Sequence, residues 1–348
     1  MDDFEVSSKI RNYKVQFHLT NEKLEEILEG HDLVIADKAI AYKLPPKLPE
    51  LIQLEAAEEL KDLGTVSRIV EEIGAFGLNR QSRIAVIGGG VAQDIGGFVA
   101  SILMRGINWS FFPTTLLAMG DSCVGGKTSI NIRAGKNLIG SFYPPGEVHV
   151  FFEFLKSLPI SLRVEGLIEV VKILAVAGER PNTIGTVEEL LGGENTIQDL
   201  VYRSLLAKKS IVESDERDVG KRQLLNLGHT FAHALEEASD MGIRHGVAVG
   251  VGIVAASKFA TLVGHKSDQE LEALIRDLLS VLPNNLAKIE WRTFQLLILR
   301  DKKWTKDIAT LILPLSSGIE AWSSKVDPLL LSMVEECARD AVLETLQR

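Results

Sequence analysis

Strand-like and helix-like segments alternate through the first part of the chain. Short apolar segments at 13–19 and 32–36 are typical of strands, and the stretch 21–28 between them has the spacing of a helix. An amphipathic helix, an apolar strand, a further helix and a buried strand then follow at 65–76, 83–87, 94–104 and 109–112. Because strands that alternate with helices form βαβ units, we expect a parallel sheet with helices on its faces.

Beyond about residue 150 the pattern changes to helical spacing with few strand signals. Several segments carry apolar residues at three- and four-residue intervals, namely 165–176, 197–215, 223–239, 246–263 and 268–279. The change predicts two domains, an α/β domain over residues 1–159 and a mostly helical domain over residues 160–348.

The composition is that of a globular protein without a generally basic surface. Hydrophobic residues make up 46% of the 348 positions and charged residues 24%. The net charge of −9 argues against a nucleic-acid or anionic-membrane surface, so any cations that hold an anionic ligand must be concentrated locally. Cys123 and Cys337 lie far apart, the first residues lack a secretory pattern, and no stretch reaches 18 strongly apolar residues. We therefore expect reduced thiols, no membrane span and a cytoplasmic protein.

Three consecutive glycines follow the strand-like segment 83–87 and precede a helical segment. Gly88, Gly89 and Gly90 would let the backbone approach a phosphate, and a helix N-terminus presents free N–H groups with a partial positive charge. The spacing is not GxGxxG, so a purely structural turn is an equal alternative. Asp94, predicted in the first helical turn, either belongs to the same site or is an acid favoured by the helix dipole.

The segment 119–145 combines several cations with five glycines and two prolines. Asp121 is the only acid between Met104 and Glu147, whereas a solvated loop normally mixes acids with bases. Lysine suits phosphate or carboxylate as a flexible point charge, and glycines let a loop wrap around a ligand. We interpret this segment as an anion-binding loop, with a solvated loop as the alternative. Its candidate residues are Asp121, Lys127, Asn131, Arg133, Lys136 and Asn137.

Three of the seven histidines lie within seventeen residues of one another. His229 and His233 stand at i and i+4, on one face of a helix, and His245 begins another helical segment. Three imidazoles, or two with a carboxylate, would leave an open position on a catalytic zinc, whereas hydrogen-bonded helical histidines are the alternative. Glu169 and Lys172 stand three residues apart among apolar neighbours, and their alternative is a weak surface ion pair.

In their order along the chain, these motifs resemble the 3-dehydroquinate synthase family of sugar-phosphate cyclases. The match runs from about residue 55 to residue 315 and rests on GGGVAQDIGGF, MRG, PTTLLAMGDSCVGGKTSINIRAGKNLIG, FLKSLP, GLIEVVK, SDERDVGKRQLLNLGHTFAHALE, RHG and LRDKK. The resemblance implies an α/β N-terminal domain with a Rossmann-like parallel sheet and a mostly α-helical C-terminal metal-binding domain. It also implies a carbon–oxygen lyase acting on phosphates, with NAD and Zn2+ or Co2+ as cofactors.

The family's functional residues can be carried over to the matching positions. The resemblance implies Glu169, His229 and His245 as metal ligands, with His233 lining the substrate pocket. It places NAD against Asp37, Glu58, Lys61, Gly88, Gly89, Gly90, Asp94, Thr114, Thr115, Asp121, Lys136 and Ser157. It places the phosphate and carboxylate of the substrate against Arg105, Lys127, Asn137, Lys172, Lys208, Arg222, Asn226 and one of Lys302 or Lys303.

The resemblance also implies a reaction sequence. In the family reaction, NAD oxidises a secondary alcohol of a seven-carbon keto-acid phosphate, and the resulting ketone acidifies the neighbouring C–H. Phosphate leaves by β-elimination, the carbonyl is reduced again, the ring opens, and an intramolecular aldol reaction closes the carbocycle. The hydride leaves and returns within one turnover, so NAD acts catalytically.

Two departures from the family pattern affect the expected function. Only twenty residues separate Asp37 from Glu58, where ordinary members fit an extra helix and strand, and this shortening resembles the aminodehydroquinate synthases. Val247 follows the RHG motif where the family normally has a glutamate. We expect a cyclase acting on the shikimate-pathway substrate or its amino analogue, as a homodimer like other family members. An NAD- and metal-dependent polyol dehydrogenase and a non-catalytic relative are the alternatives.

The substrate-binding positions separate this chain from two other cyclase classes. Arg222, Asn226 and His233 argue against the valiolone and deoxyinosose cyclases, which change residues in this region because their substrates lack the carboxylate.

Overall fold

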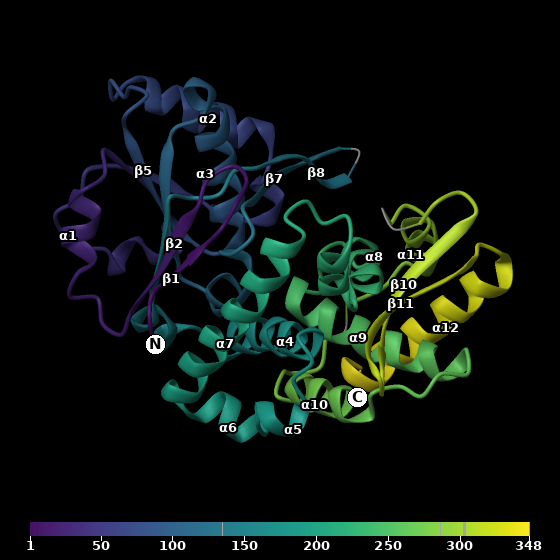
Figure 1. Cartoon of the computed structure of the whole chain (residues 1–348). Helices are drawn as coiled ribbons and strands as arrows, with labels where there is room; N and C mark the ends of the chain where they lie inside the picture. The colour runs from purple at the N-terminus through teal and green to yellow at the C-terminus, as the bar shows by residue number, and fades with distance from the viewer. Residues whose placement is uncertain (134, 286, 302–303, 348) are drawn as a thin grey trace. The chain divides into compact units, whose positions relative to one another are not determined.

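The computed structural model describes residues 1–133, 135–285, 287–301 and 304–347 (Figure 1). Its contacts divide the chain into two compact units. The first comprises Met1–Leu158 with Lys208–Arg217, and the second comprises Pro159–Ala207 with Asp218–Arg348. The expected division into 1–159 and 160–348 did not foresee that the segment Lys208–Arg217 packs with the first unit.

A seven-stranded sheet forms the centre of the first unit, in the order β1-β2-β9-β6-β5-β3-β4. Only the pairing of β1 with β2 is antiparallel, and the other neighbours run parallel. The central strands β3 and β5 are buried along almost their whole length, as expected for a sheet covered on both faces. The strands are β1 (Phe4–Val6), β2 (Tyr13–His18), β3 (Leu33–Asp37), β4 (Glu50–Leu54), β5 (Arg83–Gly88), β6 (Asn108–Pro113) and β9 (Glu147–Phe151). The predicted parallel sheet is confirmed.

The helices of this unit connect the strands and cover the sheet. α3 (Gly90–Ile102) packs on β5 and β6, and α2 (Leu63–Gly74) lies beside α3. Asp62 starts α2 by accepting a hydrogen bond from the Thr65 backbone N–H at 2.8 Å. The remaining short helices are α1 (Leu24–Glu29), η1 (Lys38–Lys43), η2 (Glu58–Leu60), η3 (Leu103–Arg105), η4 (Ala118–Ser122) and η5 (Phe152–Ser157).

The lysine-rich segment expected as a loop is mostly a β-hairpin. β7 (Lys127–Ile132) pairs antiparallel with β8 (Gly135–Phe142), and β7 also packs against α3. The glycines and charges of this segment favoured a loop in the sequence. The backbone hydrogen bonds of the hairpin, from Lys127 opposite Phe142 onward, hold it extended instead.

The second unit is mostly helical, as predicted. α9 (His245–Leu262) is long and apolar enough to cross a membrane, yet 78% of its most apolar window is buried inside the protein, as in a core helix. α4, α8, α10 and α12 all pack against it. The helices are α4 (Ile160–Val176), α5 (Pro181–Ile184), α6 (Val187–Gly192), α7 (Glu194–Ser214), η6 (Lys221–Asn226), α8 (His229–Ala238), α10 (Gln269–Ser280), α11 (Trp291–Ile298) and α12 (Pro328–Thr345).

Two details of this unit differ from the sequence prediction. The stretch 223–239, expected as one helix, is broken between η6 and α8, because Gly228 adopts the left-handed conformation with φ of 77°. An antiparallel hairpin of β10 (Ile308–Leu315) and β11 (Gly318–Lys325) packs against α9 and was not foreseen.

Two histidines, His18 and His31, pack against residues of the sheet in the first unit. His31 is 6% exposed, and its Nε2 lies 2.9 Å from the Ser110 hydroxyl. His18 stacks on Phe151, with ring centroids 4.2 Å apart. Burial, aided by neighbouring positive charge, lowers the pKa of both His18 and His31 to about 4. Both rings are therefore neutral in the folded protein at pH 7.

We expect acid to destabilise the first unit through these histidines. The pKa of each histidine in the folded protein lies below the ordinary value of 6.5. Their contribution to the free energy of unfolding is therefore complete above pH 6.5 and is lost as the pH falls toward 4. For the more buried His31, the free energy of unfolding falls by on the order of 3 kcal/mol. Urea unfolding of metal-free protein between pH 7 and pH 4.5 should show His31→Gln losing less stability than wild type. The exposed His265→Gln should match wild type, and equal pH dependence in all three would contradict the prediction.

Candidate active site

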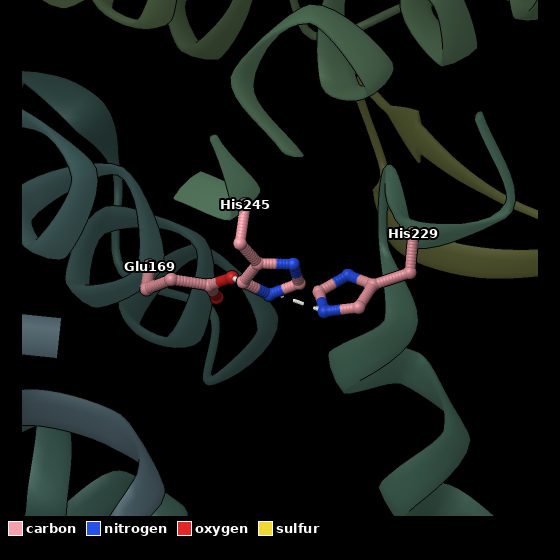
Figure 2. Close-up of side chains that lie close together, drawn as sticks. All are labelled: Glu169, His229 and His245. Atoms are coloured by element: carbon pink, nitrogen blue, oxygen red, sulfur yellow. Dashed lines mark ion pairs between the residues drawn. The ribbon is translucent and has the colours of Figure 1, made fainter. Parts of the chain in front are cut away.

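Three helices of the second unit bring Glu169, His229 and His245 together. Glu169 is on α4, His229 is the first residue of α8, and His245 is the first residue of α9. Figure 2 shows the three side chains pointing toward one another. Their candidate ligand atoms all lie within 4.8 Å of one another.

The distances in this cluster suit a divalent metal ion. Glu169 Oε1 is 3.3 Å from His245 Nε2 and 3.8 Å from His229 Nε2. Two ligand atoms about 2.1 Å from a tetrahedral zinc are themselves about 3.4 Å apart, which is close to these separations. Glu169 is fully buried, and its carboxylate oxygens have ion-pair neighbours but no well-formed hydrogen bond within the described chain. Two imidazoles and a buried carboxylate are thus a donor set that fits zinc or cobalt.

His229 is held in the orientation and protonation state of a metal ligand. Its Nδ1 lies 3.1 Å from the Leu227 carbonyl oxygen, so an N–H at Nδ1 can donate to that oxygen and leave Nε2 as an acceptor. Burial and the nearby Lys172 ammonium lower the pKa of His229 well below its ordinary value. A neutral imidazole with a free Nε2 lone pair faces Glu169 as a result.

Lys172 and Glu169 form a buried ion pair rather than a surface pair. Lys172 Nζ is 2.5 Å from Glu169 Oε2, and the side chains are 3% and 0% exposed. Burial alone would raise the pKa of Glu169, but Lys172 and His245 outweigh it and lower that pKa. The carboxylate is therefore ionised at neutral pH, as a metal ligand must be.

Glycines allow the helices that carry the ligands to approach closely. A Cβ on Gly246 would lie 2.6 Å from the Glu165 carbonyl oxygen, so α9 could not begin against α4 with a larger residue there. A Cβ on Gly252 would lie 2.1 Å from the carbonyl oxygen of Gly228, the residue just before α8. The close spacing of the three helices that carry the candidate metal ligands therefore depends on glycine at positions 246 and 252.

The other candidate residues of the second unit are His233, Arg222 and Asn226, with Lys302 and Lys303. His233 is one turn beyond His229 on α8, and the centroids of the two rings are 5.4 Å apart. Arg222 is buried, and Asn226 donates a hydrogen bond to the Gln223 carbonyl oxygen at 3.1 Å. Lys302 and Lys303 lie outside the described residues.

The glycine turn of the first unit lies at the carboxyl ends of parallel strands. Gly88 ends β5, and Gly89 is the residue just before α3, with no side chain capping the helix. Asp37 ends β3, beside β5, and a Cβ on Gly88 would lie 3.2 Å from the Asp37 Cβ. The carboxyl edge of a parallel sheet with an uncapped helix N-terminus is a common site for a dinucleotide. Gly90, Thr114 and Thr115 complete this edge, after β5 and β6.

Several predicted residues form one hydrogen-bonded network in the first unit. Lys61 Nζ is 2.5 Å from Asp94 and 2.6 Å from the Asn137 side-chain oxygen, and Lys61 is only 4% exposed. The Ser129 hydroxyl lies within hydrogen-bond distance of Asp94 and Asn137 as well. Asp94 is in the second turn of α3, not the first, so its partner is Lys61 rather than the helix N-terminus. Glu58 extends the network by accepting from the Asn131 side-chain amide at 2.8 Å.

The remaining candidates of the first unit lie on other elements. Lys208, near the end of α7, donates to the Asp121 carboxylate at 2.6 Å. Ser157 ends η5 and its hydroxyl is 3.5 Å from the Phe154 carbonyl oxygen. Arg105 ends η3 with φ of 70°, and Lys127 and Lys136 lie on β7 and β8.

Sequence reasoning missed two acids near the histidines. Glu236 on α8 lies 3.4 Å from His245 Nδ1, and Glu165 on α4 pairs with Arg244 at 3.2 Å. Glu236 could have been found, because it stands three residues after His233 and seven after His229, on the same helix face. Nothing in the local sequence distinguishes Glu165 from an ordinary helical acid.

Comparisons with known proteins identify the family of this chain. Residues 51–164 match the family model described as 3-dehydroquinate synthase N-terminal, and residues 166–304 match its C-terminal counterpart. A 3-dehydroquinate synthase from Pyrococcus furiosus is 38% identical over 297 residues, which cover 84% of this chain and 86% of that protein.

Solved structures of related folds extend over nearly the whole chain. A 2-deoxy-scyllo-inosose synthase complexed with carbaglucose-6-phosphate, NAD+ and Co2+ superposes with a TM-score of 0.83 at 24% identity, covering 97% of this chain and 100% of that one. A 2-epi-5-epi-valiolone synthase from Streptomyces hygroscopicus, with NAD+ and Zn2+ bound, has a TM-score of 0.78 at 22% identity, covering 97% and 99%. These two show a shared fold, and the family models and the Pyrococcus relative show that this chain belongs to the 3-dehydroquinate synthase family.

Proposed function

We propose that this chain is a 3-dehydroquinate synthase-type cyclase, which converts a phosphorylated seven-carbon keto acid into a carbocycle with release of phosphate. The observation that carries the proposal is the cluster of the buried Glu169 with the partly buried His229 and His245, with the Lys172 ammonium beside it. Family membership supports the same reaction class.

The proposed cofactors are NAD and a divalent metal ion. Glu169, His229 and His245 would hold the ion, and the glycine turn with Asp37, Thr114 and Thr115 would hold the dinucleotide. When bound, NAD supplies reversible hydride transfer and the metal supplies a Lewis acid for hydroxyl and carbonyl oxygens. Relatives of the same fold are crystallised with NAD+ and with Co2+ or Zn2+, which supports these assignments.

The chain's own residues supply position and charge in this proposal. His233 would line the substrate pocket. The phosphate and carboxylate of the substrate would be bound by Arg105, Lys127, Asn137, Lys172, Lys208, Arg222 and Asn226. Glu58, Lys61, Asp94, Asp121, Lys136 and Ser157 would complete the NAD site. In the metal-free form, Lys172 keeps Glu169 ionised by direct contact. Partial exposure of His245, whose side chain is 37% accessible, leaves one side of the cluster open to a ligand.

A cyclase explains the cations better than a polyol dehydrogenase does. A neutral diol would not need the lysines and arginines assigned to substrate, whereas a phosphate and a carboxylate do. The connection from Asp37 to Glu58 contains a short helix and a strand, η1 and β4, despite its length of only twenty residues. Its shortness alone keeps the amino analogue as a second candidate substrate. We further propose a cytoplasmic homodimer that binds neither nucleic acid nor membrane.

Purified protein supplied with NAD, Zn2+ and the seven-carbon keto-acid phosphate should release inorganic phosphate without net accumulation of NADH. Parallel assays with the amino analogue identify the preferred substrate through the ratio of kcat/KM values. A simple diol serves as the control, because a dehydrogenase would reduce NAD with it. Absence of phosphate release from both phosphorylated substrates would overturn the proposal.

Variants in the two units should separate metal binding from nucleotide binding. His229→Ala removes one ligand and should weaken Zn2+ binding by at least about 100-fold, while NAD affinity stays within about twofold of wild type. Lys61→Met removes the ion pair of the buried Lys61 with the partly exposed Asp94. It should weaken NAD binding by at least about 100-fold, while Zn2+ affinity stays within about twofold of wild type. Competition with a chromophoric chelator measures Zn2+, and calorimetry measures NAD. A folded variant that loses binding of both Zn2+ and NAD would contradict the assignment.

A further inference from the structure

Glu236 is a buried acid that contacts a proposed metal ligand from the side opposite the metal. Its Oε1 lies 3.4 Å from His245 Nδ1, while His245 Nε2 faces Glu169. Glu236 is 3% exposed and belongs to α8, the helix that also provides His229. A buried carboxylate requires a partner, and His245 supplies one here.

We propose that Glu236 is a positioning residue of the metal centre, which accepts a hydrogen bond from the Nδ1–H of His245. The proposal rests on the metal site of the proposed function, not on its substrate. With the proton held at Nδ1, the Nε2 lone pair of His245 is directed at the position between Glu169 and His229. Carboxylate–histidine pairs of this kind orient metal ligands and raise their basicity.

The charge of the site gives Glu236 a second effect. A divalent ion beside Glu169 leaves one excess positive charge, and Lys172, 2.5 Å from Glu169, adds another in a buried environment. Ionised Glu236 would offset one of these two charges, which lowers the electrostatic cost of holding the ion. Val247, two residues beyond His245, is apolar and cannot offset positive charge in place of Glu236.

A second metal ion is the rival explanation for the same geometry. His233, Glu236 and His245 also place three possible ligand atoms within 4.8 Å of one another. Both ions could bind only if His245 lost both ring protons and bridged them through Nδ1 and Nε2. A neutral imidazole keeps one N–H, and Glu236 is placed to receive it, so the geometry points to a single ion.

Metal binding by three variants tests the proposal without substrate or NAD. Glu236→Ala removes the acceptor and the charge, Glu236→Gln removes the charge but keeps the shape, and the exposed neighbour Glu237→Gln is the matched control. Zn2+ affinity is measured by chelator competition, the number of ions per chain by elemental analysis, and ligand geometry by the visible spectrum of the Co2+-loaded protein. Circular dichroism of each metal-free variant checks the fold.

We expect Glu236→Ala to bind Zn2+ about 10- to 100-fold more weakly than wild type, with an altered Co2+ spectrum. Glu236→Gln should fall between Glu236→Ala and wild type, and Glu237→Gln should match wild type with one ion per chain. Unchanged affinity and spectrum in a folded Glu236→Ala protein would overturn the proposal, as would two ions per wild-type chain. If Glu236→Ala weakens Zn2+ binding as expected but the wild type releases no phosphate, the proposed cyclase activity alone would be overturned.

Discussion

The proposed metal centre depends on keeping the Glu169 carboxylate charged inside the protein. Removing an isolated carboxylate from water costs several kcal/mol even after relaxation, so a fully buried Glu169 would otherwise become protonated. Lys172, one helical turn away, prevents this by direct contact. The remaining features of the second unit, from the close helix packing at Gly246 to the orientation of His229, arrange two imidazoles around that one fixed charge.

The fold could be predicted largely from local patterns. Alternating strands and helices gave the parallel sheet, and long amphipathic segments gave the helical unit, because both signals depend on neighbours along the chain. The β7–β8 hairpin was missed because glycines and cations at 125–136 favour a loop, while its extended shape comes from pairing across the hairpin and from packing on α3. The β10–β11 hairpin was missed for a similar reason, since its packing partner α9 is distant in sequence.

Residues of the candidate site could be predicted from the sequence only where the residue types were unusual. Two histidines at i and i+4 indicated a possible metal site, and the family resemblance selected His229, His245 and Glu169 as the ligand set. The contact of Lys61 with both Asp94 and Asn137 could not be predicted. It joins a residue assigned to NAD with one assigned to substrate, and such a link depends on how η2 meets the hairpin. Glu236 was overlooked because glutamates are common on helices. Its spacing of seven residues from His229 nevertheless places it on the same helix face.

The helix α7 contributes residues to both units, which affects how the chain folds during synthesis. Its last residues, Lys208–Ser214, pack with the first unit, and Lys208 provides the cation that pairs with Asp121. A ribosome extends the chain from the N-terminus, so the first unit lacks this piece until some fifty residues of the second unit, Pro159–Ala207, have been synthesised. Neither unit is therefore a continuous stretch of the gene product. A truncation near residue 158 would remove a structural part of the first unit as well as the proposed metal centre.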